Sequence, residues 1–311
     1  MEVLRNASSK WIIAGVSFYW VQIMLKAIRF KYILGIENRF FGRTIGIQGG
    51  HAILNNILPA GLGEVSILYL FKKVMNINYS KSVSSLFTLR TIDFALSAIL
   101  FALLFLFKSK IVCFSTMLWT IMECLIGISV ILLVFAGFFV YSDKFFKKIS
   151  ESAFINKFNI LSRLNKFLIA MRIHLSEFIA FDSILVLSFL TLLIWLVTYF
   201  VLVAAAKTLN SGLLFSDIFF VFLMLWPITV LPIKGILNIG SHELGWVVPL
   251  MIIGHSKATA VLVAFGTHTI FLFNVILTAI ALIIIYNRDI LRWFCDRSAY
   301  KFVVAGGAED K

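Results

Sequence analysis

Five long apolar runs constrain this chain more than any other feature of its sequence. They lie at about residues 11–28, 83–107, 112–141, 183–206 and 257–286. A helix needs about 20 apolar residues to cross the roughly 30 Å of hydrocarbon in a bilayer. Each run is also too long for a buried strand. The runs therefore predict an all-α fold, a polytopic membrane helix bundle.

The composition excludes a water-soluble fold. Hydrophobic residues make up 61% of the chain, charged residues make up 14%, and the mean hydropathy is +0.99. A soluble domain cannot bury so much apolar surface. The first run contains Gln22 and Lys26 and lacks a small-residue cleavage site, which favours a retained helix over a signal peptide. The three scattered cysteines favour packing over a disulfide, so the sequence predicts no metal site and no cofactor.

The net charge of +13 follows the expected topology of the chain. If the stretches at residues 44–71 and 213–255 each enter the bilayer and leave on the same side, most of the 28 Lys and Arg residues fall on one face. By the positive-inside rule this face is cytoplasmic. The charge therefore predicts a multi-pass protein of the inner (cytoplasmic) cell membrane that contacts anionic lipid, and no nucleic-acid partner.

These two stretches resemble each other in sequence. LPAGLGE (residues 58–64) and LPIKGILNIGSHELG (residues 231–245) are each followed by an apolar run, a Ser-Lys pair and a further apolar helix. Because they would enter from opposite faces, the sequence predicts two re-entrant, broken helical hairpins related as an inverted repeat. The alternative is a chance similarity between two breaks rich in proline and glycine.

A single transmembrane domain is expected over residues 1–311. Its parts are repeat halves at roughly 11–141 and 183–286, a cytoplasmic loop at 142–182 and a cytoplasmic tail at 287–311. One helical face of the loop is apolar and is formed by Phe154, Phe158, Leu161, Leu164 and Leu168. This pattern predicts an amphipathic helix on the cytoplasmic membrane surface, with a solvated loop as the alternative.

The first break predicts a polar site within the bilayer. Proline lacks an amide donor and glycine tolerates left-handed backbone, so Pro59, Gly61 and Gly63 should end one helix and start another near Gly63. Irregular backbone at membrane depth must be buried in protein or line a wet cavity. The new helix start can present N–H groups to a phosphate. Glu64 is either part of that site or a cap for its own helix.

Two charges in the next helix extend this hypothesis. Arg90 and Asp93 lie three positions apart and can pair, which leaves Arg90 donors for Glu64 or for a ligand phosphate. Charged groups inside membrane segments are costly, so they are functional by default. A purely structural network of these three residues is the alternative.

The second break offers similar groups. Gly240 precedes His242 and Glu243, and Pro232 precedes Lys234. His242 can act as a gate near neutral pH or as a structural hydrogen-bonding histidine. Lys234 can bind a headgroup phosphate or extend to the membrane surface.

The complete set of residues expected to bind and translocate a lipid headgroup is Asn55, Asn56, Pro59, Gly63, Glu64, Arg90, Asp93, Pro232, Lys234, Gly240, His242 and Glu243. Three lone polar residues, His268, Glu123 and Asp217, are assigned only interhelical hydrogen bonds. No catalytic residue is assigned, because the chain has no G-x-S-x-G, HExxH, Walker or Asp-x-Asp motif. Any transport would therefore run on a gradient or be passive.

The ordered series KAIRFKYIL, NNILPAGLGE, LRTIDF and LPIKGILNIGSHELG resembles the membrane region of lysylphosphatidylglycerol synthases, which recurs in stand-alone flippase-like proteins. The likeness covers nearly the whole chain. Pro59, Gly63 and Glu64 match the family pattern Leu-Pro-Ala-Arg-x-Gly-Glu, with Gly61 in place of the arginine. The resemblance also implies that this chain begins one helix later than many members of that family.

The later motifs depart from the family pattern at one position each. Arg90 and Asp93 match Glu-Arg-x-x-Asp, with leucine in place of the glutamate. Gly240 and Glu243 match Gly-x-x-Glu, with His242 in place of the usual arginine.

The resemblance implies movement of a phospholipid or lipid-linked precursor between leaflets. It does not imply the synthase reaction, which belongs to a separate soluble aminoacyl-transferase domain. One alternative is a membrane glycosyltransferase or lipid-modifying enzyme that acts on polyprenyl-phosphate sugars, with Glu64, Asp93 or Glu243 as base. The other is a non-catalytic partner of a lipid-synthesising or glycan-assembly enzyme.

Overall fold

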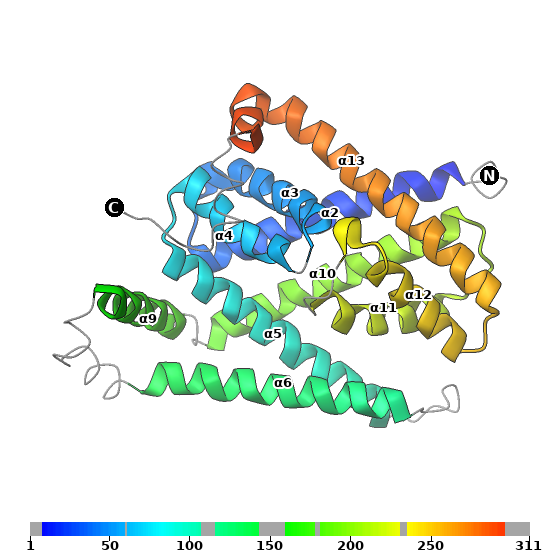
Figure 1. Ribbon diagram of the computed structural model, residues 1–311, viewed down its shortest axis with the longest axis horizontal. Coiled ribbons are helices and arrows are strands. Elements are labelled where there is room, and N and C mark those ends of the chain that lie inside the picture. Colours follow the sequence, from blue (N-terminus) through cyan, green and yellow to red (C-terminus); the bar gives the residue numbers. More distant parts are fainter. Residues whose placement is uncertain are drawn as a thin grey trace. The chain divides into compact units, whose positions relative to one another are not determined.

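The computed structural model describes residues 8–59, 61–106, 116–142, 159–177, 181–230 and 235–295, and within these ranges it contains helices and no strand. The predicted all-α fold is therefore confirmed. The elements in chain order (Figure 1) are α2 (Ser9–Leu34), η1 (Asn38–Phe40), α3 (Phe41–Ile57), α4 (Leu62–Met75), α5 (Tyr79–Leu106), α6 (Thr116–Tyr141), α9 (Asn159–Glu177), α10 (Phe181–Thr208), α11 (Phe215–Val230), η2 (Ile236–Asn238), α12 (Ser241–Ile252) and α13 (Lys257–Cys295).

Four helices in the described part of the chain are long and apolar enough to cross a membrane. The candidate spans are Ser9–Leu34, Tyr79–Leu103, Asp182–Thr208 and Lys257–Tyr286. They coincide with four of the five predicted runs, and α6 lies within the fifth. The chain is therefore a multi-pass membrane protein.

Internal contacts divide the chain into two compact units. Unit 1 comprises Met1–Ala27, Phe40–Leu70 and Val197–Lys311. Unit 2 comprises Ile28–Arg39 and Phe71–Leu196. Helices α2, α4 and α10 each contribute residues to both units, whereas α3, α11, α12 and α13 belong to unit 1 and α5, α6 and α9 to unit 2.

Both stretches that the sequence predicts to be broken consist of a helix, a break and a second helix. α3 ends at Ile57 and α4 begins at Leu62, one residue before the predicted start near Gly63. Gly61 lies between them with φ of 74°, in the left-handed region that glycine adopts readily. In the second stretch, α11 and α12 are separated by η2 and by Gly240, whose φ is 86°. Both breaks lie in unit 1.

The core of unit 1 is built around α12. Trp246 and Leu250 of this helix are completely buried and pack with Ile218 and Val221 of α11 and with Val263 of α13. Figure 1 shows α12 running beside the first half of α13, and α3 packs against the second half of α13. α12 is the helix that follows the second break, and this packing therefore holds that side of the break in place.

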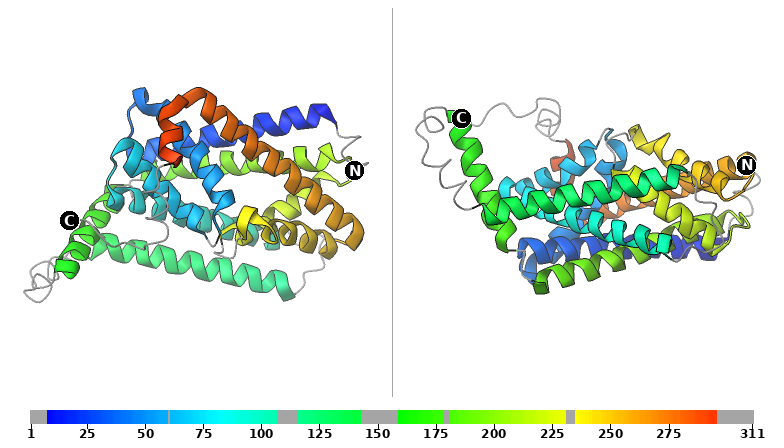
Figure 2. Two further views of the ribbon diagram at one scale, coloured as in Figure 1. Left: turned by 45° about the horizontal axis from the view of Figure 1, so that its top comes forward. Right: turned by 90° about the horizontal axis from the view of Figure 1, so that it is seen from below.

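The core of unit 2 lies among α5, α6 and α9. Figure 2 shows α5 and α6 running alongside each other. Phe139 of α6 is buried with Met171 and Leu175 of α9, and Val83 and Phe87 of α5 pack against them. Three helices that are consecutive in the described chain therefore share one apolar cluster.

α9 lies in the interval where the sequence predicts an amphipathic helix. Phe154 and Phe158 of the predicted apolar face lie outside the described residues. Leu161 and Leu164 are exposed, at 36% and 52%, whereas the buried apolar side chains are those near the C-terminal end of the helix. α5 and α6 cover the last turns of α9, whereas Leu161 and Leu164 of the predicted apolar face remain exposed.

Gly63 allows α4 to begin in contact with α3. A Cβ atom at this position would lie 2.2 Å from the Cα of Asn55. We expect Gly63→Ala to lower the free energy of unfolding by about 3 kcal/mol, the upper end of the usual cost of overpacking. Thermal denaturation of the purified protein in detergent measures this change.

Gly127→Ala on α6 is the matched control. A Cβ atom at Gly127 meets no atom within 4 Å, and alanine favours a helix over glycine. This variant should melt at or above the temperature of the unmodified protein. Equal melting temperatures for the two variants would contradict the close approach of α3 and α4.

Candidate functional site

Polar side chains join the two helices at the first break. The Ser66 hydroxyl on α4 donates a hydrogen bond to the Gly63 carbonyl at 2.5 Å, and Nδ1 of His51 on α3 lies 3.3 Å from the same hydroxyl oxygen. Ser66 is buried and His51 is partly buried. The break is therefore a packed polar junction between α3 and α4 and not an open loop.

The start of α4 is less open to a ligand than the sequence predicts. The N–H of Leu62 donates to the Pro59 carbonyl at 3.1 Å, and the N–H of Glu64 donates to the Gly61 carbonyl at 2.9 Å. These short-range turns satisfy amides that a simple helix start would leave unpaired. The N–H groups of Leu62 and Glu64 are thus not available to a phosphate in this conformation.

The second break has a different construction. Leu237 and Asn238 of η2 have φ of 57° and 59°, which is uncommon for residues other than glycine. The carboxylate of Glu243 reaches back over the start of α12, where its Oε2 accepts a hydrogen bond from the Gly240 amide at 2.7 Å. Glu243 therefore caps its own helix, which is the role that the sequence analysis weighed for Glu64.

His268 on α13 contacts both η2, which lies within the second break, and α12, which follows it. Its Nδ1 lies 2.5 Å from Oε1 of Glu243, and its Nε2 lies 2.9 Å from the carbonyl oxygen of Leu237. The ring of His242 stacks on the ring of His268 with 4.6 Å between centroids. Nε2 of His242 lies 3.3 Å from the Thr267 hydroxyl oxygen. Two histidines and one carboxylate thus gather where α12 meets α13.

The two breaks contact each other within unit 1. The side-chain amide of Asn238 on η2 donates a hydrogen bond to Oδ1 of Asn56, near the end of α3. Asn56 is buried, and its own amide nitrogen donates to the Ala52 carbonyl at 2.6 Å. A pair of asparagines therefore joins segments that are 182 positions apart in sequence.

Several buried polar atoms of α3 and η2 have no hydrogen-bond partner among the described residues. They include Nε2 of Gln48 on α3, Oδ1 of Asn55 and Oδ1 of Asn238. A buried polar atom without a partner costs about 1–3 kcal/mol. These atoms therefore mark the part of unit 1 where a polar ligand group would be most favourable.

Unit 2 contains a separate cluster of charges. Asp93 on α5 accepts a hydrogen bond from Arg29 on α2 at 2.8 Å, and Arg90 lies 3.5 Å from its other carboxylate oxygen. Arg29 also donates to the Thr191 hydroxyl on α10 at 3.0 Å. Arg29 and Asp93 are buried, and Nε of Arg29 has no partner within the described ranges. The pairing of Arg90 with Asp93 agrees with their three-residue spacing, but the shorter contact of Asp93 is with Arg29.

The predicted site residues fall into three groups. Those in unit 1 are Asn55, Asn56, Pro59, Gly63, Glu64, Gly240, His242 and Glu243, and those in unit 2 are Arg90 and Asp93. Pro232 and Lys234 lie outside the described residues.

Sequence reasoning missed the contributions of Asn238 and Arg29, and it did not identify the partner of His268. His268 makes the interhelical hydrogen bond that was expected of it, and its partner is the Glu243 carboxylate at the second break. Its isolation in an apolar helix was a usable signal, because a lone imidazole there needs a polar partner. For Arg29 the usable signal was its position directly after the first apolar run, where a charged side chain also needs a polar partner.

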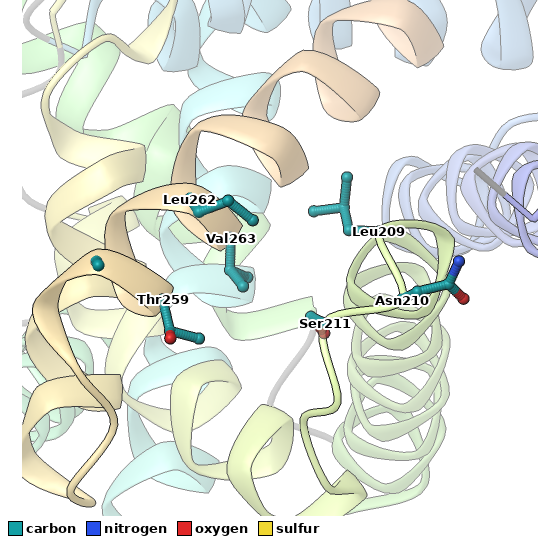
Figure 3. A pocket seen from close by; sticks show the side chains of 7 residues that line it. Leu209, Asn210, Ser211, Thr259, Leu262 and Val263 are labelled. Atoms are coloured by element: carbon teal, nitrogen blue, oxygen red, sulfur yellow. The ribbon is translucent and has the colours of Figure 1, made fainter. Parts of the chain in front are cut away.

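An open hollow lies elsewhere in unit 1, between the connection that follows α10 and the first turns of α13. It has a volume of about 400 Å³ and is lined by residues that include Asn210, Ser211 and Thr259 (Figure 3). It contains none of the predicted site residues. Within the described residues no three His, Cys, Asp or Glu side chains gather closely enough to hold a metal ion.

Comparison with known proteins agrees with the resemblance found in the sequence. A family model described as the lysylphosphatidylglycerol synthase TM region matches residues 1–300. No curated protein and no solved structure matches the chain.

The buried charges of unit 2 predict a large effect of one substitution. Asp93→Asn leaves Arg29 buried without a counter-charge, and loss of one partner of a buried pair costs about 3–5 kcal/mol. We therefore expect a clearly lowered melting temperature in detergent. Arg29→Met combined with Asp93→Leu should recover much of the loss, because the buried arginine is then removed together with its counter-charge.

Glu37→Gln is the control for a pair at the surface. Glu37 and Arg39 pair at 2.8 Å but their side chains are 64% and 70% exposed. This substitution should change the free energy of unfolding by less than about 1 kcal/mol. If Asp93→Asn melted at the same temperature as Glu37→Gln, the expected contribution of the buried Arg29–Asp93 pair to stability would be contradicted.

Proposed function

We propose a lipid-translocating function for this chain, which belongs to the lysylphosphatidylglycerol synthase TM region family. The lipid is an anionic phospholipid or a lipid-linked sugar, moved between the two leaflets. The proposal depends on one observation, the direct contact of the two helix breaks through Asn56 and Asn238.

This contact supports transport for a physical reason. Non-helical backbone within the bilayer is tolerated where it is buried in protein or lines a polar cavity. In transporters, broken helices that meet at the bilayer midplane commonly form the substrate site. Gln48, Asn55 and Asn238 add buried polar atoms without partners in the described chain, and a headgroup can supply those partners.

The proposal includes a topology. The pairs α3–α4 and α11–α12 are re-entrant hairpins that enter the bilayer and leave on the side from which they came. They form an inverted repeat within a single transmembrane domain, and residues 142–182 and the C-terminus are cytoplasmic. The exposed leucines of α9 suit a helix that lies on the surface of the cell membrane.

The predicted residues receive roles within this scheme. In unit 1, Glu64 and the asparagines at the first break bind polar groups of the lipid, and Gly63 and Gly240 shape the breaks. In unit 2, as a separate place of contact, Arg90 binds a lipid phosphate and Asp93 orients the Arg90 side chain. Pro232 and Lys234 lie outside the described residues, so their role rests on the sequence alone, in which the lysine ammonium group suits a phosphate. The acyl chains remain in the surrounding lipid, and a lipid-synthesising or glycan-assembly enzyme is a possible source of the substrate.

Exchange of a fluorescent phosphatidylglycerol between leaflets of proteoliposomes tests this function. The unmodified protein should accelerate exchange, measured by dithionite quenching of the fluorophore in the outer leaflet. Glu64→Gln and Arg90→Gln should each slow exchange by about 10- to 100-fold, because a hydrogen bond to a charged group contributes about 1.5–3 kcal/mol.

Glu37→Gln and Arg39→Gln are matched controls, since they remove the same charges from an exposed pair. Both should exchange lipid at the rate of the unmodified protein, and all variants must give equal amounts of folded protein. Unchanged exchange in Glu64→Gln and Arg90→Gln would remove these residues from the site. If neither phosphatidylglycerol nor a polyprenyl-phosphate sugar exchanged between leaflets, the proposed function would be contradicted. Chemical turnover of the polyprenyl-phosphate sugar would indicate an enzyme.

A further inference from the structure

His268 lies between two hydrogen-bond acceptors and is itself buried. Its Nδ1 contacts the Glu243 carboxylate at 2.5 Å and its Nε2 contacts the Leu237 carbonyl at 2.9 Å. A half-turn of the ring would replace both nitrogens by carbons, so these contacts define the ring orientation. A carbonyl oxygen accepts and never donates, and an ionised carboxylate does the same. The two contacts therefore require two hydrogens, whereas a neutral imidazole carries one.

The extra hydrogen belongs on the ring. Oε2 of Glu243 already accepts a hydrogen bond from the Gly240 amide at 2.7 Å. A hydrogen bond donated to a carboxylate stabilises its ionised form. Glu243 is therefore the anion, and His268 is the cation that donates to both Glu243 and Leu237.

We propose that His268 and Glu243 form a proton-binding site, occupied as an imidazolium–carboxylate pair, and that release of this proton opens the second break. The ligand of the site is a single proton. The link between opening and lipid movement rests on the proposed function, whereas the proton site itself does not.

Loss of the proton would undo the contacts that hold the break. A neutral His268 can donate to Glu243 or to Leu237, but not to both. Leu237 has a left-handed backbone that is unfavourable for leucine, so it is held in place by its surroundings. Its neighbour Asn238 makes the hydrogen bond to Asn56. Freeing Leu237 therefore also loosens the contact between the two breaks.

The neighbouring His242 does not add a second proton to this site. It stacks on His268 at 4.6 Å, and two imidazolium rings at that distance would repel each other. Its Nε2 faces the Thr267 hydroxyl, which itself donates to the Ala264 carbonyl, so a neutral His242 satisfies the contact. His242 therefore takes no part in binding the proton of His268.

Other titratable groups are carried by the elements around α13 in unit 1. Those described are His242 and Glu243 on α12, Arg43 and His51 on α3, Lys10, Tyr19 and Lys26 on α2, Tyr199 and Lys207 on α10, Asp217 on α11, His255 just before α13, and Lys257 and Tyr286 on α13 itself. Within the described residues, Glu243 and His242 are the members of this set in contact with His268.

Nitrogen-15 NMR of the histidine-labelled protein tests the proton site without any transport measurement. The chain has five histidines, so the other four single His→Gln variants identify the His268 signals by elimination. We expect both ring nitrogens of His268 to be protonated while the second break is closed and one of them to lose its proton when the break opens. A neutral His268 throughout the pH range in which the protein is folded would overturn the proposal.

Lipid exchange at equal pH on both sides of the vesicle tests the opening. The rate in the unmodified protein should rise with pH, by up to about tenfold per pH unit where the proton is released. His268→Gln and Glu243→Gln should exchange lipid at rates that no longer depend on pH in that range. An unchanged pH profile in both folded variants would overturn the opening step.

His255→Gln is the matched control, because His255 pairs with Asp217 at 3.2 Å in the same unit but away from both breaks. It should keep the pH profile of the unmodified protein. The two failures can be told apart. A doubly protonated His268 with no lipid exchange at any pH would contradict the proposed function alone, and pH-independent exchange with a neutral His268 would contradict the proton site alone.

Discussion

The structure depends on one constraint, that peptide groups buried away from water must find partners within the protein. The two helix breaks meet it differently. At the first break the backbone provides the partners, through the short turns from Leu62 to Pro59 and from Glu64 to Gly61. At the second break the side chains of Glu243 and His268 provide them. Two stretches that resemble each other in sequence are therefore stabilised by different chemistry.

This difference has a consequence for how each break can move. Backbone hydrogen bonds in the first break do not change with pH, and the contact of Gly63 with Asn55 leaves little room for rearrangement. The second break is held by groups whose hydrogen bonds depend on a proton. Because Asn238 bonds to Asn56, a change at the second break is transmitted to the first. One break thus acts as the fixed support and the other as the movable part.

The sequence predicted well those features that depend on local composition. Apolar runs located the spans, and proline with glycine located both breaks, since these residues change the backbone wherever they occur. It could not predict contacts that depend on which helices pack together. Asp93 was paired with Arg90 by spacing, yet its closer partner is Arg29, 64 positions away. The packing of α9 against α5 and α6 could not be predicted for the same reason, because neighbouring helices and not periodicity decide which turns are covered.

The identity of residue 242 bears on whether the second break can hold a proton. An arginine at this position would be charged at every physiological pH. A fixed positive charge in place of His242 would lie against His268 and disfavour a second cation. Histidine can be neutral and still stack on its neighbour and bond to Thr267. Histidine at position 242 therefore allows His268 to carry the second hydrogen that its contacts with Glu243 and Leu237 require.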